Sequence, residues 1–287
     1  MMEKAVLGSA KSIQELHQRT LEIIECNRKN EEERLKTGII YLPTWREDRY
    51  GSPNSFLRSA LFAAIQSKDR KYLEKTEVFS QQGITVTYTG RQLNQEDLTV
   101  WLALVDLMKK DPLGKECKFT SHEILKYMNL GTGGREYERL ENSILRMTAC
   151  AVVIKTDRST YGGNLIHNFV IDEITKCYRI TLNRHLIKLF DDNDWTAIDW
   201  EQRKQLKHKP LCLKLHNYYS SHEKPLPVSL EFLLNITGST NSQKADFKRK
   251  VKAALEELVK IDFLKGSSIE GNLVNVERSK SSMPKLK

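Results

Sequence analysis

The predicted order of helices and strands occurs twice within these 287 residues, and few folds accommodate such a repeat. Residues 120–183 and 229–279 each predict a short capped helix, a turn, a long amphipathic helix and a β-hairpin, with one further strand at the end of the first copy. The short helices match at a constant offset of 108 in the numbering: Ser121, Glu123, Leu125 and Met128 with Ser229, Glu231, Leu233 and Ile236. The long helices match at an offset of 111: Leu140, Ile144 and Met147 with Val251, Leu255 and Leu258. One small difference in the length of the turn reconciles both offsets, so the pattern indicates an internal duplication.

This order of elements is that of a winged-helix domain, in which a helix-turn-helix is followed by a β-hairpin. The predicted fold class is therefore α+β, with two tandem winged-helix domains and an N-terminal helical arm. We expect residues 1–53 to form the arm and an extended linker, residues 54–196 to form winged-helix domain 1, and residues 197–287 to form winged-helix domain 2.

Several element boundaries follow from caps and periodicity. Domain 1 is expected to open at Asn54 or Ser55, which would cap a helix over 56–65. Strands are expected at 150–157 and 164–174, on either side of a turn at 158–163, and a further strand at 177–183. In domain 2, one continuous helix is expected over 201–222.

Positive charge is concentrated in the last third of the chain. The net charge is +9, and residues 200–287 hold 17 lysines and arginines against 9 aspartates and glutamates. Such a local excess favours a polyanionic partner, because binding releases the partner's condensed counterions. A solvated surface without a partner is the simpler alternative.

The charge distribution along the third helix of domain 2 is the opposite of the one that the helix dipole favours. Basic side chains crowd its first half, although a helix N-terminus favours acids. The unfavourable order is explained if this end of the helix faces the phosphates of DNA, since third helices of this motif enter the major groove. Periodicity places Phe247, Val251 and Leu255 inward and Arg249 and Lys252 outward.

Candidate DNA contacts follow from this orientation. At the start of the third helix of domain 2 and on its outer face, we expect Asn241, Ser242, Gln243, Lys244, Lys248, Arg249 and Lys252 to reach base edges or phosphates. In the second wing and tail, we expect Lys265, Arg278 and Lys280 to contact phosphates. In domain 1, whose third helix has no net charge, the candidates are Arg135, Arg139, Asn142, Lys155 and Arg158.

No catalytic or metal site is predicted. Five scattered cysteines without a C-x-x-C pair indicate neither a zinc site nor a disulfide framework, and favour a reducing bacterial cytoplasm. No apolar run is long enough to span a bilayer. We expect no cofactor. The acidic cluster at 191–194 leaves a magnesium-dependent nicking or primase-type enzyme as an alternative.

Several blocks in order resemble the TrfA family of plasmid replication initiators. They are RSALF (58–62), ITVTYTG (84–90), REYERLENSILRMTA (135–149), YYSSHEKPLPVSLEF (218–232) and KVKAALEEL (250–258). One departure concerns residues 34–43, which lack the Q-x-x-L-F-type segment by which some members dock on the sliding clamp.

The resemblance implies an initiator that is not an enzyme. It would bind directly repeated sites (iterons) in double-stranded DNA at a plasmid origin, help to open an adjacent A+T-rich region, and recruit the host replicative helicase and its loader. It also implies self-association to a dimer and leaves single-stranded origin DNA open as a further partner. The alternative is a winged-helix transcriptional repressor, which predicts one palindrome in place of a tandem array.

Overall fold

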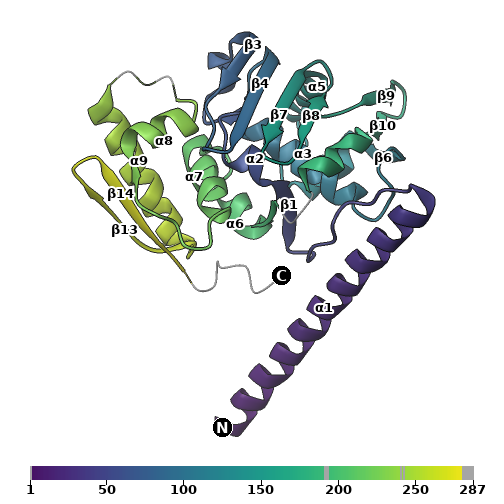
Figure 1. The fold of residues 1–287 in the computed structure, drawn as a ribbon, viewed down its shortest axis with the longest axis horizontal. Helices are drawn as coiled ribbons and strands as arrows, with labels where there is room; N and C mark the ends of the chain where they lie inside the picture. Colours follow the sequence, from purple (N-terminus) through teal and green to yellow (C-terminus); the bar gives the residue numbers. More distant parts are fainter. Residues whose placement is uncertain (1, 191–193, 240, 242, 280–287) are drawn as a thin grey trace.

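Two lobes, each with its own hydrophobic core, make up the body of the protein (Figure 1). The structure is a computed structural model that describes residues 2–190, 194–239, 241 and 243–279. We call the part around the first core, from Leu42 to Trp200, the first lobe, and the part around the second core, from Leu206 to Val274, the second lobe. Helices and antiparallel strands occur in both, which confirms the α+β class.

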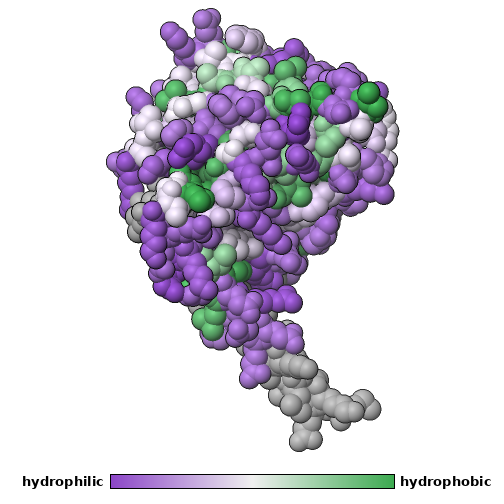
Figure 2. Space-filling view, turned by 90° about the vertical axis from the view of Figure 1, so that its right-hand side faces the viewer, coloured by the Kyte–Doolittle hydropathy of each residue, from purple (hydrophilic) through white to green (hydrophobic). Residues whose placement is uncertain are grey.

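The N-terminal helix α1 (Met2–Thr37) stands away from both lobes as a long arm (Figure 1). The charged, sparsely apolar sequence of this segment explains why it does not pack along its whole length. Near its end, the Asn27 side chain accepts a hydrogen bond of 2.6 Å from the backbone amide of Thr44. Figure 2 shows a mostly hydrophilic face of the molecule with small hydrophobic areas, below which the arm projects.

The first lobe contains most of the strands. Its helices are α2 (Asn54–Leu57), α3 (Gln95–Met108), α4 (Ser121–Tyr127) and α5 (Gly134–Thr148), with short 3-10 turns at Ser67–Asp69 and Arg184–Leu189. Its strands are β1 (Arg49–Pro53), β2 (Phe62–Ala63), β3 (Tyr72–Val78), β4 (Ile84–Arg91), β5 (Leu93–Asn94), β6 (Glu116–Thr120), β7 (Ala151–Thr156), β8 (Thr160–Gly163), β9 (Asn168–Asp172), β10 (Cys177–Thr181) and β11 (Trp195–Asp199).

Helix α3 is the central element of the first lobe. It is apolar on nearly every side, and Leu98, Trp101 and Leu102 are almost completely buried. Asn94 caps it by accepting hydrogen bonds from the amides of Glu96 and Asp97, and the Asp97 carboxylate accepts one from the Asn94 amide in return. This capping box fixes where the helix begins.

The first lobe contains two main sheets. The larger has the antiparallel order β3-β4-β7-β8, and the smaller has the order β6-β10-β9. Strand β1, the first of the lobe, pairs with β11, the last, and β2 pairs with β5.

The second lobe is smaller and mainly helical. Helix α6 (Trp200–Gln205) connects the two lobes. The second lobe comprises α7 (Pro210–Ser220), β12 (Val228–Ser229), α8 (Leu230–Ile236), α9 (Lys244–Lys260), β13 (Leu264–Glu270) and β14 (Leu273–Arg278), and its sheet has the order β12-β14-β13. Phe247, Val251 and Leu255 of α9 are buried in the second core, as their periodicity predicts.

The two lobes repeat one topology. In each, a strand leads into a short helix, a long helix follows, and a hairpin returns so that its second strand lies at the centre: β6-β10-β9 in the first lobe and β12-β14-β13 in the second. The buried positions of α5 and α9 keep the predicted offset of 111. The helix caps are Thr120 and Ser229, however, so the short helices align at an offset of 109 rather than 108.

The hairpin predicted for the first copy is wrong. Residues 160–163 form strand β8, not a turn, and β8 pairs with β7, while β9 pairs with β10. The β7–β8 hairpin is therefore an insertion between the long helix and the repeated hairpin. Strand β7 of this hairpin pairs with β4, and β4 comes before α3 and before both helices of the repeat in the chain.

Three further expectations need correction. The helix expected over 56–65 is a single turn, α2, and its N-cap residue is Pro53, without a side-chain cap. The expected extended linker contributes Leu42 and Trp45 to the first core. The helix expected over 201–222 is broken into α6 and α7, because Pro210 has no amide hydrogen for a helix interior.

The lobes approach closely at Gly238, which has a φ of +62°. A Cβ atom there would lie 2.8 Å from the Cβ of Ala63 in the first lobe. Gly271 has nearly the same φ, +60°, but a Cβ there would meet nothing within 4 Å. A comparison of substitutions at Gly238 and Gly271 therefore distinguishes the cost of backbone strain from the cost of steric contact.

We expect Gly238→Ala to lower the free energy of unfolding by about 1–3 kcal/mol more than Gly271→Ala does. Both variants carry the cost of a left-handed alanine, about 1–2 kcal/mol, and only Gly238→Ala adds overpacking, about 1–3 kcal/mol. Urea unfolding of the two variants measures the difference. Equal losses would show that the lobes do not meet as closely as described.

Candidate nucleic-acid interface

Helix α9 presents a basic and solvent-exposed face at the surface of the second lobe. The side chains of Lys244, Lys248, Arg249 and Lys252 are all exposed, whereas the opposite face is buried against α7 and the hairpin. The helix begins after Gln243, whose side chain makes no capping bond. The predicted inward and outward faces of this helix are thus confirmed.

One carboxylate partly balances this charge. Asp246 accepts a bond of 2.5 Å from Arg249 and one of 2.7 Å from Lys250, and Asn241 donates to it at 2.7 Å. The bonds from Lys250 and Arg249 hold the pKa of Asp246 well below its usual range. The Arg249 side chain is nevertheless 76% exposed. Exposed ion pairs of this kind contribute little stability, so a phosphate can compete for the guanidinium.

The remaining candidates of the second lobe lie in different surroundings. Lys248 donates to the carbonyl of Gly271 at 2.9 Å, which ties α9 to the turn of the hairpin. Lys265 is exposed on β13 and pairs with Glu277 at 2.7 Å. Ser242 and Lys280 lie outside the described residues.

The predicted phosphate contact of Arg278 is wrong, because its side chain is buried. The guanidinium donates to the carbonyl oxygens of Ser220 and His222 and lies over the Phe263 ring, 5.1 Å from the ring centroid. Burial lowers the pKa of Arg278 to about 10. This arginine joins the end of the hairpin to the end of α7.

In the first lobe, Arg135, Arg139 and Asn142 are exposed on α5, as their spacing predicts. Arg139 pairs with Glu136 at 3.0 Å. Lys155 and Arg158 are also exposed, but they belong to β7 and the turn after it. They therefore lie on the inserted hairpin and not on the hairpin that corresponds to β13–β14.

A buried carboxylate, which sequence reasoning did not single out, fixes α5 in place. Asp97 of α3 has no exposed side-chain surface, and it accepts bonds from Ser143 at 2.6 Å and Arg146 at 2.7 Å on α5. Its second oxygen accepts a bond of 2.9 Å from Arg70. In the sequence, only the position of Asp97 at the start of a helix distinguishes this residue, and that position does not predict its ion pairs with Arg70 and Arg146.

Buried bases at the junction of the lobes join α6 and α7 to the first lobe. Arg203 of α6 donates to the carbonyl of Gln95 at 3.1 Å, to the Thr99 hydroxyl at 2.8 Å and to Asn217 at 2.9 Å. Lys214 of α7 donates to two carbonyl oxygens of the first lobe. Because their partners are neutral oxygens, burial lowers the pKa of both side chains, to about 9 for Arg203 and about 7 for Lys214.

We expect the free energy of unfolding to rise with pH between about 7 and about 10 through Lys214. The unfolded lysine has an ordinary pKa of about 10.4, so in this window the unfolded chain holds more protons at this residue than the folded chain. The increase can reach about 1.4 kcal/mol per pH unit. Urea unfolding at pH 7 and pH 9 should show that Lys214→Met reduces it. The exposed substitution Lys110→Met should leave it unchanged, and equal slopes in both variants would contradict the assignment.

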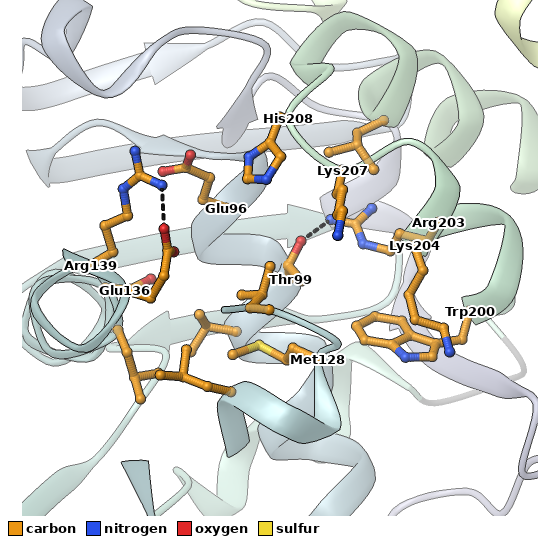
Figure 3. A pocket seen from close by; sticks show the side chains of 16 residues that line it. Glu96, Thr99, Met128, Glu136, Arg139, Trp200, Arg203, Lys204, Lys207 and His208 are labelled. Carbon is orange, nitrogen blue, oxygen red and sulfur yellow. Dashed lines mark hydrogen bonds and ion pairs between the residues drawn. The ribbon is translucent and has the colours of Figure 1, made fainter. Parts of the chain in front are cut away.

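A cleft between the lobes brings α5 next to the α6–α7 connection (Figure 3). Its floor is apolar and includes Met128, Leu140 and Trp200. Its rim is charged, with Arg139 and Glu136 on one side and Lys204, Lys207 and His208 on the other. A second cleft, beside α9, is lined by Lys209, Arg249 and Lys250 among others.

Two other properties concern the described residues alone. No helix among them combines the length and the apolar character needed to cross a membrane. They bring together no group of three or more His, Cys, Asp or Glu side chains that could hold a metal. Of the predicted acidic cluster at 191–194, only Asp194 is described, and it accepts a bond of 2.9 Å from Asn54.

These features define a class of α+β proteins in which two similar units each present a long helix at the surface. The family model described as TrfA protein matches residues 5–278, and the chain therefore belongs to the TrfA family. A curated relative, the plasmid replication initiator protein TrfA of Escherichia coli, is 27% identical over 252 residues. The match covers 85% of this chain and 65% of that relative's length.

One solved structure shows a similar fold at low sequence identity. Domains 2 and 3 of RctB are 14% identical with a TM-score of 0.54, and the match covers 79% of this chain and 98% of that one. A Pi initiator protein in complex with iteron DNA is 13% identical with a TM-score of 0.47, covering 68% of this chain and 96% of that one.

Proposed function

We propose that this protein is a plasmid replication initiator that binds directly repeated sites in duplex DNA at an origin. The observation that carries the proposal is the exposed, basic first half of α9 on a helix-turn-helix whose other face is buried. Membership of the TrfA family and the name of the Escherichia coli relative support the same function.

In this proposal each lobe contains a winged-helix unit. Helix α9 enters the major groove, where Arg249 and Gln243 can reach base edges. Helix α5, with Arg135, Arg139 and Asn142, makes a second and weaker contact. Bound initiators then promote opening of an A+T-rich region and draw in the host helicase and its loader. The protein acts in the bacterial cytoplasm and self-associates to a dimer.

The first experiment tests replication itself. The gene and its flanking repeats are cloned into a plasmid without an origin and introduced into a suitable bacterial host. Stable replication is expected, and a frameshift within the gene should abolish it. If the intact segment never supports replication while the purified protein represses its own promoter, the repressor alternative is favoured.

We also propose that the protein has no catalytic activity of its own. The purified chain, incubated with supercoiled plasmid and magnesium, should produce neither nicks nor primers. Nicking that is lost on substitution of Asp194 would support the enzyme alternative instead.

A further inference from the structure

A short basic segment separates the two surface helices. We call residues 204–209, which form the end of α6 and its connection to α7, the bridge. On one side, Lys204, Lys207 and His208 line the same cleft as Arg139 of α5 (Figure 3). On the other, Lys209 lines the same cleft as Arg249 of α9. The bridge thus lies between the two clefts that adjoin the long helices.

The bridge is held rigidly although its lysines are exposed. Arg203, directly before it, is buried against α3, and Leu206 within it is completely buried in the second core. Pro210, directly after it, occupies the first turn of α7. His208 has a φ of +65°, a left-handed conformation that costs a histidine about 1–2 kcal/mol and persists only when its surroundings impose it.

The charges on the bridge are available to a ligand. In the part of the chain that the structure describes, Lys207 and His208 form no ion pair. Lys204 pairs with Glu201 at 2.5 Å, and Lys209 pairs with Glu257, but both lysines remain partly or fully exposed.

Among the described residues, the nearby carboxylates form no ion pair with Lys207 or His208. On the rim of the first cleft, Glu136 is already bound to Arg139, and Glu96 accepts a bond of 2.9 Å from Ser67. Asp69 lines the second cleft. The bridge therefore places a cationic group, centred on Lys207, between α5, whose acidic and basic side chains balance, and the basic exposed face of α9.

We propose that the bridge is a third DNA contact, in which Lys207 and Lys209 bind backbone phosphates between the positions occupied by α5 and α9. This inference rests on the proposed function. If α5 and α9 bind a single duplex, the DNA backbone between them passes the bridge, because the bridge lies between the clefts beside the two helices. Contacts of this kind fix the register of the protein on DNA without reading sequence.

The test compares Lys207→Ala/Lys209→Ala with Lys110→Ala in the full-length protein. Lys110 lies just beyond the far end of α3, about 20 Å from Glu96 at the cleft, because each helical residue rises about 1.5 Å. Affinity is measured over a range of salt on a duplex that carries the origin repeat and on an unrelated duplex. If the double variant proves unstable, the single substitution Lys207→Ala replaces it.

We expect the double variant to lose about tenfold in affinity on both duplexes and about 2 units of the salt slope, near 0.9 per phosphate contact. The Lys110→Ala control should match the wild type. A repeat duplex with neutral methylphosphonate linkages at its central positions should bind the wild type and the double variant equally. Neutral linkages at the outer positions should preserve the difference between them.

An unchanged salt slope in the double variant overturns the inference, and so does a loss that persists on the centrally neutralised duplex. If the proposed function itself is wrong, the result is different, because the wild type would then bind the repeat duplex and the unrelated duplex equally. In that case the salt slopes on unrelated DNA still decide whether the bridge binds phosphate.

Discussion

Replacing Asp97 by alanine should lower the free energy of unfolding by about 3–5 kcal/mol. The Asp97 carboxylate is completely buried and serves two guanidinium groups, Arg70 and Arg146, together with the Ser143 hydroxyl. The Arg70 side chain is itself only 3% exposed. Removing the carboxylate leaves a buried cation without its counterion, which costs far more than an exposed ion pair contributes.

The control for this prediction is Asp111→Ala. Asp111 also pairs with a basic side chain, Lys115, but it is 44% exposed, and its loss should change stability by no more than about 0.5 kcal/mol. Urea unfolding followed by circular dichroism measures both variants. If Asp97→Ala costs as little as Asp111→Ala, α5 is not held to α3 in the manner described.

The same substitution links stability to function. Two of the three side chains that Asp97 binds, Ser143 and Arg146, belong to α5, the long surface helix of the first lobe. A milder variant, Asp97→Asn, keeps the shape of the side chain but removes its charge. If Asp97→Asn folds, we expect it to bind DNA more weakly, because α5 loses its ion pair with α3. The DNA contacts of α9 should be unchanged, because among the described residues Asp97 makes no bond to that helix.

Local patterns predicted the second lobe better than the first. The buried stripe of α9 follows from spacing alone, because Phe247, Val251 and Leu255 repeat at helical intervals. The partners of β7 do not follow from spacing. That strand pairs with β4, from which three helices separate it in the chain, and no turn between them indicates the pairing.

Basic residues show why the candidate site was only partly predictable. Arg203, Lys214 and Arg278 look like solvated bases in the sequence, yet all three are buried. Their partners are mostly neutral oxygens, many of them backbone carbonyls, from segments distant in sequence, such as Leu57 for Lys214 and Ser220 for Arg278. Lys244 and Lys252 have the same chemistry and are exposed, because they follow the outer face of a helix whose inner face is apolar.

Neutralising the outer face of α9 should have the largest effect on DNA binding. In the triple variant Lys248→Ala/Arg249→Ala/Lys252→Ala we expect affinity for the origin repeat to fall on the order of 100-fold at moderate salt. The salt slope should fall by about 3 if all three side chains neutralise phosphates, since each contact contributes about 0.9. Fluorescence anisotropy with a labelled repeat, at several salt concentrations, measures both quantities.

Arg249 can be separated from its neighbours in the same experiment. If it reads a base, Arg249→Ala alone should cost about 1–3 kcal/mol on the repeat and much less on unrelated DNA. The matched control is Lys260→Ala, in the last turn of the same helix, where the lysine pairs with Glu257 and lies away from the basic first half. Alanine favours helix, so neither variant should unfold α9. If the triple variant and the control variant bind with the same affinity, α9 does not contact DNA. The basic residues at the start of this helix would then have no explanation in DNA binding.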